Sequence, residues 1–95
     1  MTSIITPGRL EVGLQLPIQS QSRIYAEPWE EGTGAAELGT VVDACEAAGL
    51  FYVAVCDHVA VPREPAERMQ TVWYDTVATL AWIAARTQRL RLLSH

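Results

Sequence analysis

Apolar and polar residues alternate in blocks that predict three strands. The segment 10–16 alternates strictly and stops at Pro17, which predicts a strand ended by proline. Gly13 in its middle indicates a close backbone approach or a ligand against the sheet. The segment 51–56 is apolar without interruption, so both of its faces are expected to be covered, as in a parallel sheet. The segment 90–95 opens a third strand.

Two further segments carry apolar residues at the spacing of amphipathic helices. In the segment 35–48 they recur at i, i+3, i+4 and i+7, and Thr33 and Gly49 are suited to cap its two ends. The segment 73–87 is the second predicted helix, with Asp75 in its first turn. The expected core stripe of the first helix comprises Leu38, Val41, Val42 and Cys45, and that of the second comprises Val77, Leu80, Ala81 and Ala84.

The connections between these elements differ in length. The loops that follow the first two strands, 18–33 and 59–72, are long and rich in proline and polar residues, whereas the helix-to-strand turns are short. Within the first loop, Glu30 and Glu31 are expected to form a solvated turn. The order strand-helix-strand-helix-strand with these loop lengths is typical of parallel α/β folds, in which the carboxyl ends of the strands carry the functional loops.

The composition narrows the classes of protein that the chain can represent. It has 95 residues, 49% of them hydrophobic, with 7 basic and 11 acidic residues and a net charge of −4. These values are typical of a globular chain, and the acidic balance argues against a nucleic-acid-binding protein. Cys45 and Cys56 lie in apolar segments, where reduced thiols are expected. No secretory signal and no run long enough to span a membrane is evident, so we expect a cytoplasmic protein without a membrane partner.

A dinucleotide-binding sheet is the first alternative, and the segment 32–39 is its only glycine-rich candidate. It does not match the dinucleotide fingerprint, because its third glycine is displaced and the preceding residues 29–31 do not form a strand. The loop before the first helix is also too long for a turn that grips phosphate.

Asp57 and His58 are the most informative pair, because they follow the fully apolar strand and precede a long loop. A histidine at the carboxyl end of a parallel strand is suited to move a proton near neutral pH. The competing interpretation, about equally weighted, is a structural pair in which Asp57 ties the loop or caps a helix. A metal site is not expected, because adjacent strand residues point to opposite faces and no ligand spacing is present.

Several segments together resemble the luciferase-like monooxygenase family. They are residues 11–17 of the first strand, 44–50 at the end of the first helix, 55–59 with the Asp57-His58 pair, and 73–75 with 84–92 in the second helix and third strand. The resemblance spans nearly the whole chain, through order and spacing rather than one decisive motif. Within the family, the Asp-His pair is most similar to the branch that uses coenzyme F-420, a deazaflavin, whereas other branches use FMN.

The resemblance implies an eight-stranded (β/α)8 TIM barrel, dimeric when full length, with the coenzyme across the carboxyl ends of its strands. His58 would be the catalytic acid or base beside the coenzyme ring, and Asp57 would help to bind the coenzyme. Ser94 and His95 would lie against the ring at the end of the third strand. The reaction would be hydride transfer to or from a small organic substrate, or oxygen insertion into it.

Two more residues are assigned to the substrate side of this site. Trp29 lies in the loop that walls the substrate pocket in this family, although packing on the rim is the alternative. Gln15 could reach the ring or bond a neighbouring strand. Pro62 stands where the sugar-phosphate dehydrogenases of the branch carry tryptophan, which argues against that substrate.

Residues 1–95 are thus expected to form one partial domain, the first three strands and two helices of the barrel. Such a sheet has bare edges and an uncovered inner face, so the free monomer should be marginally stable or prone to aggregate. Two other hypotheses remain. One is a truncated, non-catalytic α/β remnant that acts only through partner association, and the other is a barrel enzyme that uses Asp57 and His58 without a flavin.

Overall fold

The computed structural model describes residues 3–20, 22, 24–58, 60–70 and 72–95. The elements formed by these described residues are, in order, β1 (Gly13–Gln15), η1 (Pro28–Glu30), α1 (Ala35–Ala48), β2 (Tyr52–Val55), α2 (Arg63–Met69), α3 (Thr76–Arg86) and β3 (Arg91–Ser94), where η1 is a 3-10 helix.

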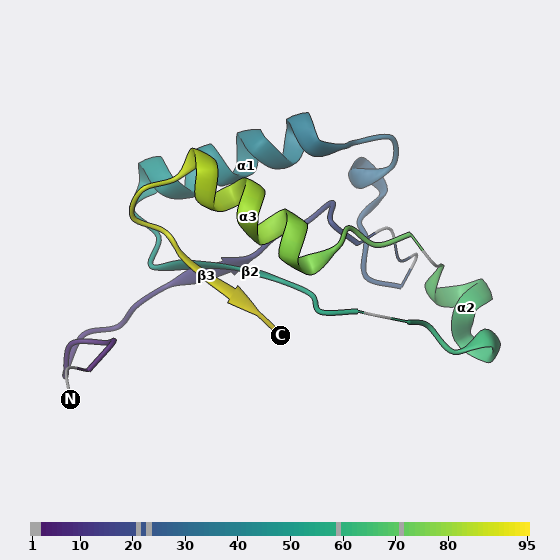
Figure 1. The fold of residues 1–95 in the computed structure, drawn as a ribbon, viewed down its shortest axis with the longest axis horizontal. Coiled ribbons are helices and arrows are strands. Elements are labelled where there is room, and N and C mark those ends of the chain that lie inside the picture. The colour runs from purple at the N-terminus through teal and green to yellow at the C-terminus, as the bar shows by residue number, and fades with distance from the viewer. Residues whose placement is uncertain (1–2, 21, 23, 59, 71) are drawn as a thin grey trace.

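The three strands form one parallel sheet in the order β1-β2-β3. Leu14, Val53 and Leu92 lie opposite one another across the three strands, so they share one face. Helices α1 and α3 lie together on one side of the sheet, and no helix of the described residues covers the other side (Figure 1). The predicted α/β class with a parallel sheet is therefore confirmed.

Strand β1 is shorter than the predicted 10–16, although backbone pairing to β2 extends it by one residue at each end. The carbonyl of Val12 accepts the Phe51 N–H at 2.8 Å, and the Leu16 N–H donates to the carbonyl of Ala54 at 2.8 Å. Leu10 is 88% exposed and lies in the segment that leads away from the sheet. The predicted strand is thus confirmed for its second half only.

The core lies between the sheet and the two helices. Its buried members are Leu16, Ile18, Leu38, Val42, Cys45, Val53, Val55, Ile83 and Leu90. The predicted stripe of α1 is confirmed, with Val41 half-buried and the other three residues buried. Burial raises the pKa of the Cys45 thiol. Gly49 ends α1 at φ 74°, in the left-handed conformation that glycine adopts without strain.

The predicted stripe of α3 is wrong for three of its four residues. Val77, Ala81 and Ala84 are exposed, whereas Thr79 and Ile83 are buried against the core. The Thr79 hydroxyl donates to the carbonyl of Asp75 at 2.7 Å, so its polar atom is satisfied within the helix. The methyl group of this threonine can therefore face the core, and the helix is rotated relative to the one its aliphatic residues predict.

The predicted start of the second helix and the predicted N-cap of the first need correction, whereas the first helix begins at Ala35 as predicted. Helix α3 begins at Thr76 rather than at 73, and Asp75 is its N-cap, accepting the Ala78 N–H at 2.7 Å. Thr33 does not cap α1. Its hydroxyl donates to the carbonyl of Glu30 at 2.6 Å, and Gly34 is the N-cap instead.

Helix α2 lies within the segment 59–72, which was predicted to be a loop. Pro65 is in its first turn, where a missing N–H removes no helical hydrogen bond. None of its residues is buried, so the sequence carries no apolar stripe that would have indicated a helix. In Figure 1 it projects beyond the carboxyl ends of the strands.

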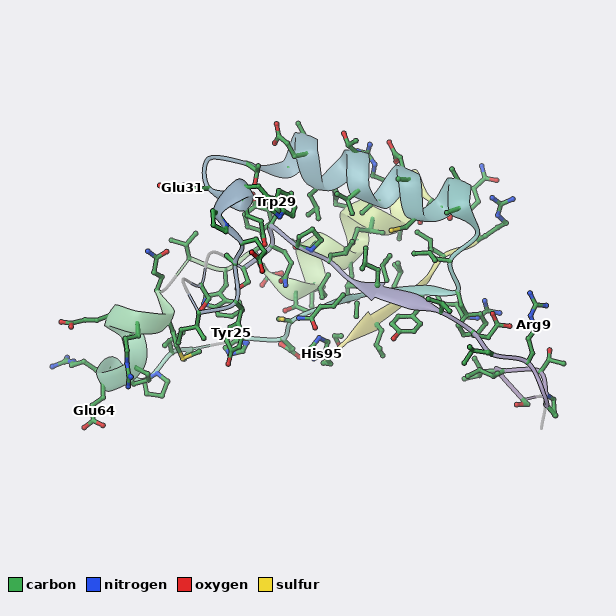
Figure 2. The ribbon with its side chains drawn as sticks, turned by 180° about the vertical axis from the view of Figure 1, so that it is seen from behind. Arg9, Tyr25, Trp29, Glu31, Glu64 and His95 are labelled. Atoms are coloured by element: carbon green, nitrogen blue, oxygen red, sulfur yellow. The ribbon has the colours of Figure 1, made fainter. Side chains whose placement is uncertain are left out.

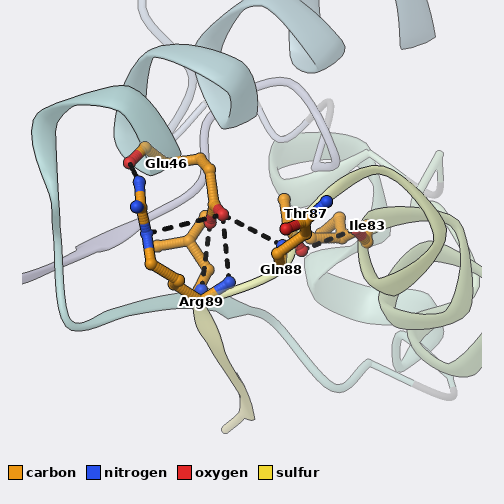
Figure 3. A network of polar contacts seen from close by, with 6 residues as sticks. Glu46, Ile83, Thr87, Gln88 and Arg89 are labelled. Carbon is orange, nitrogen blue, oxygen red and sulfur yellow. Dashed lines mark hydrogen bonds and ion pairs between the residues drawn. The ribbon is translucent and has the colours of Figure 1, made fainter.

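Glu46 joins the end of α1 to the turn before β3 (Figure 3). Its Oε1 atom accepts the N–H groups of Gln88 and Arg89, and its Oε2 atom accepts the N–H of Leu90, each at 3.0 Å. The guanidinium of Arg89 donates to the Glu46 carbonyl at 3.2 Å. These backbone donors, that of Gln88 above all, lower the pKa of Glu46.

Candidate functional site

A cavity of about 600 Å³ opens at the carboxyl ends of the strands. Residues from β1, from the segments that follow β2 and β3, and from both long loops surround it, and they are Gln15, Leu16, Pro17, Ile18, Gln19, Ser20, Tyr25, Ala26, Glu30, Cys56, His58, Met69 and His95. The volume lies within the usual range for small-molecule sites, about 300–1,000 Å³. The carboxyl edge of the sheet is therefore where this chain can hold a ligand.

His58 lines this cavity, and its ring stacks on the indole of Trp73. The two ring centroids are 4.0 Å apart and the ring planes differ by 11°. Such a stack fixes the plane of the imidazole, and His58 remains an exposed residue at the cavity. Trp73 itself is half-buried and supports the ring of His58.

Asp57 is not among the residues that line the cavity. Thr76, the first residue of α3, donates its hydroxyl hydrogen bond to the Cys56 carbonyl at 3.0 Å and approaches Oδ1 of Asp57 at 3.5 Å. The Cys56 carbonyl therefore makes the shorter bond that joins the end of β2 to α3, and the Asp57 side chain lies beside the same hydroxyl.

Gln15 and Cys56 meet at the edge of the cavity, where the Gln15 amide donates to Sγ of Cys56 at 3.1 Å. His95 follows β3 and is fixed by its backbone. Its N–H donates to the carbonyl of Val55 at 3.1 Å, and its carbonyl accepts the Asp57 N–H at 2.8 Å. The cavity therefore brings together Gln15, His58 and His95 from three different strand ends.

Ser94 and Trp29 are not among the cavity residues. Ser94 is the last residue of β3 and pairs with Val55. Trp29 lies on η1 and is 57% exposed, whereas Tyr25 of the same loop does line the cavity. In Figure 2, Tyr25 and His95 lie low in the middle of the view, and Trp29 lies higher.

Glu30 is a cavity residue that the sequence interpretation missed. It was expected in a solvated turn, but it is only 6% exposed. Its Oε2 atom accepts the Ile18 N–H at 2.7 Å, and its Oε1 atom accepts the Glu27 N–H at 2.9 Å. The pattern Pro28-Trp29-Glu30 carried the signal, because proline opens a helix and an acid two residues later can reach back to its N-cap.

Cys56 and Met69 were missed for a different reason. Cys56 is half-buried at the end of β2, and Met69 is the last residue of α2. No local pattern marks either of them, because both reach the cavity through the path of the loop that follows β2.

The two long loops are joined to each other beside the cavity. The carbonyl of Gln19 accepts the Tyr74 N–H at 2.8 Å. Ser20 and Trp73 form an antiparallel bridge. The loop after β1 thus holds the segment that carries the indole under His58.

Two classes of site find no support among the residues that the structure describes. The described residues contain no group of three or more His, Cys, Asp or Glu side chains able to hold a metal ion. Among these same residues, no helix is long and apolar enough to cross a membrane.

Comparison of the chain with protein-family models, with curated proteins and with solved structures finds no match.

Proposed function

We propose that this chain is the N-terminal segment of a luciferase-like flavin-dependent oxidoreductase, with coenzyme F-420 preferred over FMN. The observation that carries the proposal is the cavity at the carboxyl ends of three parallel strands, lined by Gln15, His58 and His95. Parallel α/β enzymes place their reactive groups at this edge.

The sheet supports a barrel rather than a sheet with helices on both faces. Helices α1 and α3 cover one face of the sheet (Figure 1). The register of the strands places Gly13, Gln15, Tyr52, Ala54, Arg91 and Leu93 on the opposite face. In a (β/α)8 barrel that face would be the interior, closed by the other strands. The radius of gyration is 14.7 Å, against about 12 Å for a compact domain of this length, which agrees with an open segment.

The start of α1 argues against the dinucleotide-binding alternative. In such proteins the N–H groups at a helix N-terminus hold a phosphate directly after a strand. Here the Gly34 N–H donates to Oε2 of Glu37 at 2.8 Å, and this hydrogen bond lowers the pKa of Glu37. An ionised carboxylate therefore occupies the position that a phosphate would need.

The residues of the cavity fit the polar edge of a planar heterocycle. The imidazoles of His58 and His95 and the amide of Gln15 are able to donate or accept hydrogen bonds there. A bound flavin or deazaflavin would supply hydride-transfer chemistry. His58 would hold or release a proton at a ring nitrogen, and its stack on Trp73 would keep the imidazole plane fixed.

The test uses the complete reading frame that contains this segment. Titration with coenzyme F-420 and, separately, with FMN should show saturable binding of the deazaflavin and weaker binding of FMN. The variant His58→Ala should lose turnover and keep most of its coenzyme affinity. Val77→Ala, on the exposed side of α3, is the matched control and should resemble the wild type. Failure of both coenzymes to bind would overturn the proposal.

A second candidate function is association with a partner through the uncovered face of the sheet. The absence of a covering helix on that face among the described residues favours it, together with the unpaired edges of β1 and β3. The same titration separates the two candidates. A protein that binds neither coenzyme but forms a stable complex or oligomer would support association.

A further inference from the structure

We propose that Glu30 is a positioning residue for His58. Its carboxylate holds a strained turn at Ile18, and this turn sets the plane of the His58 ring through Trp73 and Tyr74. The inference rests on the proposed role of His58 as the acid or base of the cavity.

The turn at Ile18 has a backbone conformation that a β-branched residue rarely adopts. Its φ is 73°, and the Gln19 N–H donates to the carbonyl of Pro17 at 2.8 Å across it. These features define a γ-turn of the positive-φ kind, which is rare and strained. A strained conformation persists only where its surroundings hold it in place.

Glu30 contributes to that hold through two hydrogen bonds. Its buried carboxylate accepts the Ile18 N–H at 2.7 Å and, through its other oxygen, the Glu27 N–H at 2.9 Å. Hydrogen bonds to an ionised acceptor are stronger than those between neutral groups. Because Glu30 belongs to η1, this carboxylate ties the end of β1 to the 3-10 helix and fixes where the chain runs after the turn.

From the turn, backbone contacts lead to His58. The Gln19 carbonyl accepts the Tyr74 N–H at 2.8 Å, and Ser20 bridges Trp73. The indole Nε1 of Trp73 is buried and has no hydrogen-bond partner among the described residues. The backbone bridge, rather than a bond from the indole, therefore fixes the ring on which His58 stacks at 4.0 Å.

The decisive variant is Glu30→Gln in the complete reading frame, with no coenzyme added. Two N–H donors point at the two carboxylate oxygens, so an amide leaves one donor facing its own NH₂ group. The neighbouring acid Glu31 has an exposed side chain, and Glu31→Gln is the matched control.

The readout is the imidazole region of the proton–carbon NMR spectrum, in which the His58 signals are identified by their loss in His58→Gln. The indole ring shifts these signals upfield, and Trp73→Leu gives their unstacked position. We expect Glu30→Gln to move the His58 signals toward that position and to speed hydrogen exchange at the Ile18 amide. Glu31→Gln should leave both at their wild-type values.

Wild-type His58 signals in folded Glu30→Gln protein would overturn the proposal. If Glu30→Gln does not fold, Glu30→Asp decides, because it keeps the charge but is too short to reach both amides. Displaced His58 signals in that variant support the proposal, and wild-type signals reject it. If the wild-type protein binds neither coenzyme while these shifts occur as expected, the proposed function fails and the role of Glu30 stands.

Discussion

The ring of Tyr52 lies directly over the backbone of Gly13 in the neighbouring strand. The two residues are opposite each other in the parallel register of β1 and β2, on the face that the helices do not cover. A Cβ atom at Gly13 would overlap the Tyr52 ring. The close approach that the sequence predicted at Gly13 is confirmed, and a side chain of this protein rather than a ligand fills the space.

Gly13→Ala should therefore destabilise the sheet. The added methyl group forces the Tyr52 ring out of its position, and overpacking of this kind costs about 1–3 kcal/mol in the free energy of unfolding. Urea denaturation of the variant measures the loss. The double variant Gly13→Ala/Tyr52→Ala should lose less than the sum of the two single variants, because the clash is then absent. Strict additivity would show that the ring does not hold this position.

The buried face of α3 supplies a second prediction. Ile83→Ala removes a side chain that is fully buried in the core, and the expected loss is about 2–5 kcal/mol. Val77→Ala on the same helix removes a side chain that is 75% exposed, and it should change stability by less than about 0.5 kcal/mol. Thermal or urea unfolding of both variants would decide between this face and the one predicted from the aliphatic residues. Equal losses of stability in the two variants would contradict the burial of Ile83 and the exposure of Val77.

Helix α1 and helix α3 show why one helix face was predicted correctly and the other was not. In α1 the buried residues Leu38, Val42 and Cys45 are apolar, so their spacing reveals the face. In α3 the buried face includes Thr79, whose hydroxyl is bonded within the helix, and the aliphatic Val77 points outward. A rule based on side-chain polarity cannot anticipate this arrangement.

The candidate site could likewise be predicted from the sequence only in part. The ends of parallel strands meet at one edge of the sheet, so the sequence allows Gln15, His58 and His95 to be placed at the same edge. Glu30 could not be assigned so directly, because its partner Ile18 lies twelve residues away across an irregular loop. Its burial depends on the path of that loop, which local preferences do not determine.

The hydrogen bonds of Glu46 lead us to expect that the fold loses stability in acid. Backbone N–H donors in the turn before β3 lower its pKa, so this carboxylate binds its proton more weakly when folded than when unfolded. Its contribution is complete above the unfolded pKa, about 4.3, and is lost as the pH falls through the lower folded pKa. Urea midpoints measured from neutral pH down to about pH 3 should therefore decline.

Glu46→Gln is the variant that isolates this contribution. It should lower stability at neutral pH, because its NH₂ group cannot accept the backbone N–H groups that the carboxylate accepts. It should also flatten the decline in acid. The exposed pair of Asp43 and Arg86, joined at 2.9 Å, lowers the pKa of Asp43, so Asp43→Asn is the comparison for a surface carboxylate. An unchanged acid profile in Glu46→Gln would show that other carboxylates carry the effect.

Asp57 allows the structural and coenzyme-binding roles of the Asp57-His58 pair to be separated. Its side chain approaches the Thr76 hydroxyl at the start of α3 and is not among the residues that line the cavity. We therefore expect Asp57→Asn to keep its coenzyme Kd within about twofold, which corresponds to less than about 0.5 kcal/mol. Its stability should fall by no more than about 1 kcal/mol, because the Thr76 hydroxyl keeps its shorter hydrogen bond to the Cys56 carbonyl at 3.0 Å.

Fluorescence titration of Asp57→Asn beside the wild type measures the Kd. An increase of about tenfold or more would place Asp57 in contact with the coenzyme, as the family resemblance implies, and would require the end of β2 to turn when the coenzyme binds.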